Sequence, residues 1–178
     1  MKKVLVSLTM AGFLLVGCSK SDTQVDTTVS IIKDGEVSIK IVVGQKMEPL
    51  RLNDQFDNPK VVDDSVKKLI FVFKKETGHT IREYFKTKSA KYINDNNIVM
   101  VADVSKMPSL IRDFVAIPDL QESKYSILLL DNEELSMKYQ NTKNVTKIMI
   151  VELDKLVVDR VMFVSTIEQL DDYFNGNL

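Results

Sequence analysis

Three short apolar runs, separated by segments with helical periodicity, constrain the fold of this chain more than any other feature. They span residues 69–73, 98–104 and 125–130. Apolar runs of this length are typical of strands that are buried on both faces of a sheet. Strands that alternate with helices pair in parallel through helical crossovers. The sequence therefore predicts an α/β fold built around parallel strands.

Antiparallel hairpins are expected on both sides of this unit, which makes the predicted sheet mixed. The first hairpin contains Asp34-Gly35, a pair that favours a tight turn, and its strands are rich in β-branched residues. It forms an N-terminal extension of the sheet. The predicted strand pairs are residues 29–33 with 37–43, 50–52 with 60–62, and 147–152 with 156–164.

Three segments have the residue spacing of amphipathic helices. The first is expected over residues 80–92. The second follows Ser105, which can cap it, and has Pro108 in its first turn. The third follows Thr166, another capping residue. The apolar residues expected to face the core are Ile81, Tyr84, Phe85, Leu110, Ile111, Phe114, Val115, Ile167, Leu170, Tyr173 and Phe174.

The chain begins with a short basic stretch and an apolar segment that ends at its single cysteine, Cys18. Residues 4–16 are almost entirely apolar, a length typical of a signal peptide and short for a membrane-spanning helix. The residues Leu15-Val16-Gly17-Cys18 resemble a lipobox, the cleavage and lipidation signal of bacterial lipoproteins. The alternative is an uncleaved apolar helix that happens to contain a cysteine.

The lipobox resemblance implies cleavage between Gly17 and Cys18 and attachment of acyl chains, such as palmitate, to Cys18. Three acyl chains would anchor the protein stably in a membrane. The chain would then comprise a signal peptide (1–17), a lipidated polar tether (18–28) and one globular domain (29–178). In many Gram-negative bacteria an Asp after the cysteine retains a lipoprotein in the inner membrane. Ser19 at this place implies the outer membrane, facing the periplasm.

The composition excludes several classes of function for this chain. A single cysteine cannot form an intramolecular disulfide or a cysteine-based zinc cluster. The formal net charge of −1 provides no general attraction to nucleic acid, which is not an expected partner. One histidine and scattered methionines give no metal-site pattern, and the sequence contains no phosphate-binding loop. We therefore expect neither a cofactor nor a metal.

The order of predicted elements resembles the thioredoxin fold over residues 43–174. Residues 44–59, GQKMEPLRLNDQFDNP, are similar to the opening of redoxin-type domains, where a Gly, a Pro and a short strand precede an Asp-rich turn. Residues 102–111, ADVSKMPSLI, are similar to a stretch in exported bacterial proteins of unassigned function. The resemblance implies a thioredoxin-like mixed sheet flanked by helices.

The chain departs from this family at the residues that carry its chemistry. Redox-active members have a Cys-x-x-Cys pair just after the first buried strand, but residues 76–81 read ETGHTI here. The proline that precedes the third buried strand is absent from residues 124–127, KYSI. Thiol–disulfide exchange requires a thiolate, and lipidation would consume Cys18. We therefore do not expect oxidoreductase activity.

His79 is the main candidate for a binding residue, because it occupies the segment that carries the active site in the family. Its helix N-terminus could bind an anion through free backbone N–H groups, with His79 and Arg82 holding a carboxylate or phosphate. The alternative is a solvated loop in which Thr77 or Thr80 caps the helix. The residues expected to contact a ligand or partner are Glu76, Thr77, Gly78, His79, Thr80 and Arg82. Asp54, Asp57, Asp63 and Asp64 are interpreted as turn and capping residues.

Three functions fit these observations. The leading hypothesis is a non-catalytic thioredoxin-like domain that serves as a binding or assembly module in the cell envelope, with a protein partner. The second is a ligand carrier or enzyme that uses His79 and Arg82 without sulfur. The third is a structural envelope lipoprotein.

Overall fold

The computed structural model describes residues 40–178. The predicted signal peptide, the lipidation site Cys18, the tether and the turn Asp34-Gly35 lie outside the described residues. They stay predictions.

The centre of the molecule is a five-stranded mixed sheet with the strand order β5-β4-β3-β6-β7. The three apolar runs of the sequence form the parallel part of the sheet, and the predicted C-terminal hairpin adds two antiparallel strands. Both predictions are confirmed. The strands are β3 (Lys68–Val72), β4 (Ile98–Asp103), β5 (Ile127–Leu130), β6 (Ile148–Asp154) and β7 (Val157–Val164).

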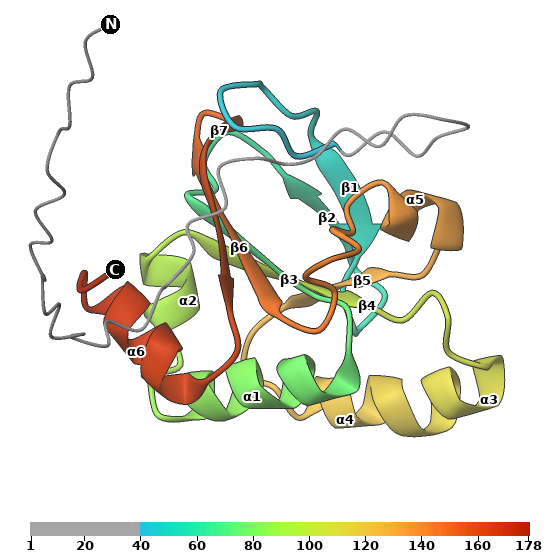
Figure 1. The fold of residues 1–178 in the computed structure, drawn as a ribbon. Helices are drawn as coiled ribbons and strands as arrows, with labels where there is room; N and C mark the ends of the chain where they lie inside the picture. Colours follow the sequence, from blue (N-terminus) through green and yellow to red (C-terminus); the bar gives the residue numbers. More distant parts are fainter. Residues whose placement is uncertain (1–39) are drawn as a thin grey trace, which may run out of the picture.

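Helical segments connect the strands and flank the sheet (Figure 1). Residues 109–121 form one helical segment with a π-helical turn in its middle, labelled η1 here. The segments are α1 (Lys75–Lys86), α2 (Tyr92–Asp95), α3 (Ser109–Ile111), η1 (Arg112–Ala116), α4 (Ile117–Gln121), α5 (Glu133–Met137) and α6 (Ile167–Phe174).

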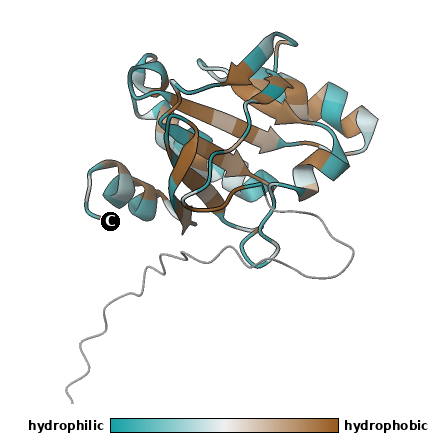
Figure 2. Ribbon diagram, turned by 90° about the horizontal axis from the view of Figure 1, so that it is seen from above, coloured by the Kyte–Doolittle hydropathy of each residue, from teal (hydrophilic) through white to brown (hydrophobic). Residues whose placement is uncertain are grey.

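Each face of the sheet carries its own hydrophobic core, because alternate side chains of a strand point to opposite faces. Ile70 of β3 faces the layer of α1, α2 and α6, where Ile81, Tyr84 and Leu170 are buried. Phe71 faces the opposite layer. There the antiparallel pair β1 (Leu50–Asn53) and β2 (Pro59–Val62) and the helix α5 lie. Figure 2 shows that hydrophobic residues make up most of the central strands.

The described part of the predicted N-terminal hairpin is not a strand, so that prediction is wrong for residues 40–43. The Lys40 N–H donates to the Lys138 carbonyl, and the Gly44 N–H donates to Val158. The segment thus joins two different elements. Ile41 is 1% exposed and fills the core between them. Its β-branched residues serve packing here, without a strand partner. The predicted pairing of residues 50–52 with 60–62, in contrast, is confirmed.

The last helix begins as predicted, because the Thr166 hydroxyl accepts a hydrogen bond from the Gln169 N–H. Leu170 and Tyr173 are buried under it, but Ile167 is 44% exposed and does not reach the core. A hydrogen bond from Tyr173 to an ion pair between β6 and β7 attaches this helix to the sheet. Arg160 donates two hydrogen bonds to the Glu152 carboxylate, at 2.9 and 3.1 Å, and the Tyr173 hydroxyl donates a third at 2.7 Å.

Acid should weaken the attachment of α6, because the pKa of Glu152 lies below its ordinary value of 4.5. Burial raises this pKa, but the hydrogen bonds from Arg160 and Tyr173 outweigh that effect. The Glu152 carboxylate therefore binds a proton more readily in the unfolded chain than in the folded one. The stabilisation that charged Glu152 provides is lost as pH falls below 4.5 through the pKa of the folded state. Glu152→Gln is expected to lower the free energy of unfolding by about 1 kcal/mol at neutral pH, with a smaller loss in acid. Urea denaturation at neutral pH and in acid measures the two losses of unfolding free energy. Equal losses at the two pH values would contradict the prediction. Glu122→Gln, at an exposed position, is the control.

Candidate functional site

Residues 76–82 lie within a helix, since α1 begins at Lys75 and not at Thr80 as predicted. Lys74 is the N-cap residue, and its side chain makes no capping hydrogen bond. The Thr77 and Thr80 hydroxyls instead donate to the carbonyls of Lys74 and Glu76, inside the helix. The interpretation of this segment as a solvated loop capped by Thr77 or Thr80 is therefore wrong. Threonine is a common capping residue, but here both hydroxyls donate to backbone carbonyls of preceding residues.

One side of α1 lines an apolar cavity of about 320 Å³. Of the six candidate contact residues, Gly78, His79 and Arg82 line it, whereas Glu76, Thr77 and Thr80 do not. Thr77 is buried, and Glu76 is exposed to solvent. Of the sequence-predicted candidates, the structure thus brings one glycine, the histidine and the arginine to one cavity.

The cavity lies where the parallel strands β3 and β4 end. Val72 and Ala102, near the ends of these strands, form its floor, and the side chains of the helical segment 109–121 form the wall opposite α1. In open α/β sheets, ligands bind beyond the carboxyl ends of the strands. The remaining apolar lining residues are Val104, Met107, Ile111, Val115, Ala116 and Leu120.

The apolar stripe of the segment 109–121 points to solvent, so the prediction that it faces the core is wrong. Leu110, Ile111, Phe114 and Val115 are 72%, 52%, 76% and 57% exposed. No described element covers this side of the helix, which runs beside α1 and projects past the edge of the sheet (Figure 1). Ser105 does not cap the segment, whose N-cap residue is Pro108. We call these four side chains the apolar patch.

Arg82 connects the two helical walls of the cavity. Its guanidinium donates to the Asp119 carbonyl at 2.9 Å and pairs with the Asp119 carboxylate at 2.5 Å. Its third donor, Nε, is buried and has no hydrogen-bond partner within residues 40–178. An unpartnered buried donor costs free energy, and here it belongs to a residue that lines the cavity.

The rim of the cavity is positively charged. Lys74 and Lys75 line it at the start of α1, and neither forms an ion pair with a described residue. The acid on the same rim, Asp103, already accepts hydrogen bonds from the Ser105 N–H, the Ser136 hydroxyl and Gln140. These neutral donors satisfy the hydrogen-bonding capacity of Asp103 but leave its charge, so the two lysines give the rim a net positive charge.

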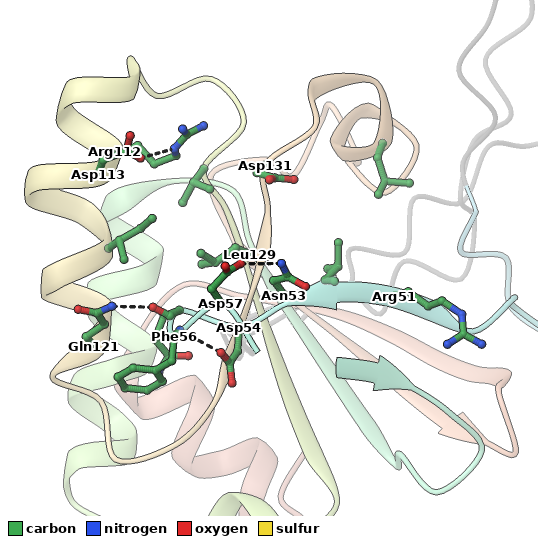
Figure 3. A pocket seen from close by; sticks show the side chains of 15 residues that line it. Arg51, Asn53, Asp54, Phe56, Asp57, Arg112, Asp113, Gln121, Leu129 and Asp131 are labelled. Carbon is green, nitrogen blue, oxygen red and sulfur yellow. Dashed lines mark hydrogen bonds and ion pairs between the residues drawn. The ribbon is translucent and has the colours of Figure 1, made fainter. Parts of the chain in front are cut away.

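A second cavity, of about 590 Å³, lies between β1 and the segment 109–121 and has polar walls (Figure 3). Two of its acids have local partners: Asn53 donates to Asp57, and Arg112 pairs with Asp113. Arg51 points away from this group in Figure 3. These contacts give Asp57 and Asp113 structural roles.

Asp54 and Asp63 shape turns, as predicted. The Asp54 carboxylate accepts hydrogen bonds from the N–H groups of Phe56 and Asn58, and Asp63 accepts one from Ser65. Burial raises the pKa of Asp54, but these hydrogen bonds, with one from the Ser126 hydroxyl, hold it below its ordinary value. Sequence reasoning missed the neighbouring Gln55, which is 2% exposed and links β1 to β5.

The described residues hold no site for metal or thiol chemistry. The only cysteine of the chain lies outside residues 40–178. Within those residues, no three side chains of His, Cys, Asp or Glu lie close enough together to hold a metal ion. In the same range, no helix has the length and apolarity needed to cross a membrane.

Comparisons with known proteins establish the fold. No protein family matches the sequence, and no curated protein is similar to it. Among solved structures, StoA from Bacillus subtilis has a TM-score of 0.50 and 11% identity, over 71% of this chain and 96% of its own. A proposed thioredoxin from Neisseria meningitidis has a TM-score of 0.50 and 11% identity, over 72% and 87%. The domain therefore has a thioredoxin-like fold, as its sequence predicted.

Proposed function

We propose that this protein is a membrane-anchored periplasmic lipoprotein whose thioredoxin-like domain is redox-inactive and serves as a binding or assembly module of the cell envelope. The structural similarity to StoA and to the Neisseria protein supports the thioredoxin-like fold in this proposal. The segment 76–81, which carries the thiols in redox-active relatives, contains none here. A scaffold without its reactive groups remains useful for binding, because function depends on the site and not on the fold.

The apolar patch is the observation that carries the binding role. Its members Leu110 and Phe114 are large, and more than two thirds of each is exposed. Isolated exposed apolar residues are ordinary, but several that adjoin one another at a cavity are typical of interaction sites. Ile111 and Val115 belong both to the patch and to the cavity wall, so the two features form one surface.

The proposed anchor rests on the sequence of residues 1–18. A basic start, an apolar segment and the ending LVGC support export and lipidation of Cys18. Ser19 supports sorting to the outer membrane. The polar residues after Ser19 would separate the domain from the membrane.

Crosslinking in living cells tests the binding role. We expect a photoreactive amino acid at Phe114 or at His79 to capture an envelope component, because both positions border the proposed surface. The control position is Lys155, an exposed residue in the turn between β6 and β7. That turn lies at the end of the sheet where β3 begins, whereas the cavity lies where β3 ends. Equal capture from all three positions, or none from the first two, would refute the proposed surface.

A further inference from the structure

We infer that the cavity between α1 and the segment 109–121 binds an anionic amphiphile, with an acyl chain in the apolar interior and a carboxylate at Lys74 and Lys75. This inference deepens the proposed binding role and rests on the same surface. It depends on three features of the cavity: its apolar walls, the state of the backbone around it, and the charge of its rim.

The interior of the cavity suits a hydrocarbon chain. Its volume of about 320 Å³ falls at the lower end of the range of small-molecule sites. There is free space beside Gly78, which has no side chain to fill it. A Cβ atom at this position would have only the Val72 side chain within contact distance, at 3.8 Å. The backbone would therefore accept a side chain at this position, and the space that it would fill is free for a ligand.

The surrounding backbone favours a hydrocarbon over a peptide. The sheet ends at β5 and β7, and no residue of either strand lines this cavity, so an extended peptide could not add a strand here. The walls consist mainly of apolar side chains. Peptide N–H and C=O groups buried against them would lose their hydrogen bonds to water without replacement. An acyl chain has no such groups.

The rim determines the charge of the ligand. Lys74 and Lys75 are exposed lysines on one edge of the cavity, and Asp103 beside them already has three hydrogen-bond donors. A carboxylate at this edge would interact with the lysines while its chain enters the cavity. A neutral amphiphile would lack that interaction.

Calorimetric titration with decanoate tests the inference. The protein is the chain of residues 18–178 with Cys18→Ser, which carries no lipid of its own. We expect saturable binding of decanoate at one site, and weaker binding of decanol, which has the same chain length but no charge. The absence of decanoate binding would overturn the inference, as would tighter binding of an acidic apolar peptide.

Two pairs of variants locate the site, one pair in the interior of the cavity and one at its rim. Gly78→Leu should weaken decanoate binding by about tenfold or more, because the new side chain fills the cavity. It should keep the helix, since leucine favours a helix more than glycine does. Thr80→Leu, in the same helix but outside the cavity, should bind like the unchanged protein. Equal binding by the two variants would place the ligand elsewhere.

The charge pair tests the rim. Lys74→Gln with Lys75→Gln should weaken decanoate binding roughly fivefold, as expected for two partly exposed cations, and leave decanol binding unchanged. Lys91→Gln with Lys143→Gln, at exposed positions away from the cavity, is the matched control. Equal losses in both pairs would overturn the role of the rim. This titration needs neither anchor nor partner, so its failure is distinguishable from a failure of the crosslinking experiment.

Discussion

Replacing Cys18 with serine is expected to abolish the attachment of fatty acid to the protein. The proposed anchor needs a thiol, because the acyl groups are attached through a thioether, and a serine hydroxyl cannot replace it. Each buried CH₂ group of an acyl chain contributes about 0.8 kcal/mol to membrane binding, so the loss of all the chains should be an all-or-none effect. Cell fractionation, together with labelling by a radioactive or clickable fatty acid, measures it.

The outcome distinguishes the two interpretations of the N-terminal segment. Ser19→Ala changes the neighbouring residue and keeps the thiol, so it should remain in the membrane fraction. If the unchanged protein remained in the membrane fraction after a carbonate wash but incorporated no fatty acid, residues 4–16 would act as an uncleaved apolar helix. The lipoprotein proposal would then be wrong, whereas the inference about the cavity would not be affected.

Replacing Gln55 with alanine should lower the free energy of unfolding by about 3 kcal/mol. The Gln55 side chain accepts a hydrogen bond from the Ile127 N–H at 2.7 Å and donates one to the Tyr125 carbonyl at 2.8 Å. It thereby fixes the end of β1 to the start of β5. Alanine would leave these groups without their partner, and Gln55 is only 2% exposed, so water could not readily replace it.

Gln121→Ala is the matched control for this prediction. Gln121 is exposed and donates one hydrogen bond, to the Gln55 carbonyl at 2.8 Å. Its loss should cost less than about 1 kcal/mol, because water can reach the site. Urea denaturation of both variants provides the comparison. Similar free energies of unfolding would show that Gln55 does not hold β5 in place.

Local sequence patterns predicted the strands because these patterns reflect burial directly. Residues 69–73 are apolar without interruption, and β3 lies at the centre of the sheet with Ile70 and Phe71 facing opposite cores. The start of α1 could not be predicted in this way. Lys74 is not a capping residue type, whereas Thr80 is, so the sequence favoured the wrong start.

The candidate site was predicted only in part, because its geometry depends on contacts distant in sequence. The spacing of Leu110, Ile111, Phe114 and Val115 correctly indicates a helix with one apolar side. It cannot show whether that side meets the core or remains exposed, since both arrangements produce the same periodicity. The role of Gln55 could not be predicted for the same reason. Its hydrogen-bond partners, Tyr125 and Ile127, are more than 65 residues away in the sequence. A glutamine close to two acids gives no local signal of such contacts.

The π-helical turn η1 sets the phase between the two halves of its helix. In an uninterrupted α-helix, Ile117 would lie on the same side as Phe114, at a spacing of three residues. A π turn contains one additional residue, which rotates the second half of the helix by about 100°. Phe114 is accordingly 76% exposed, while Ile117 is half-buried and Leu120 packs against the core. One additional residue thus leaves the apolar side of the first half exposed and packs the second half against the core. Deleting a residue within Arg112–Ala116 would align the apolar sides of the two halves, so that both would face the core or both would face solvent.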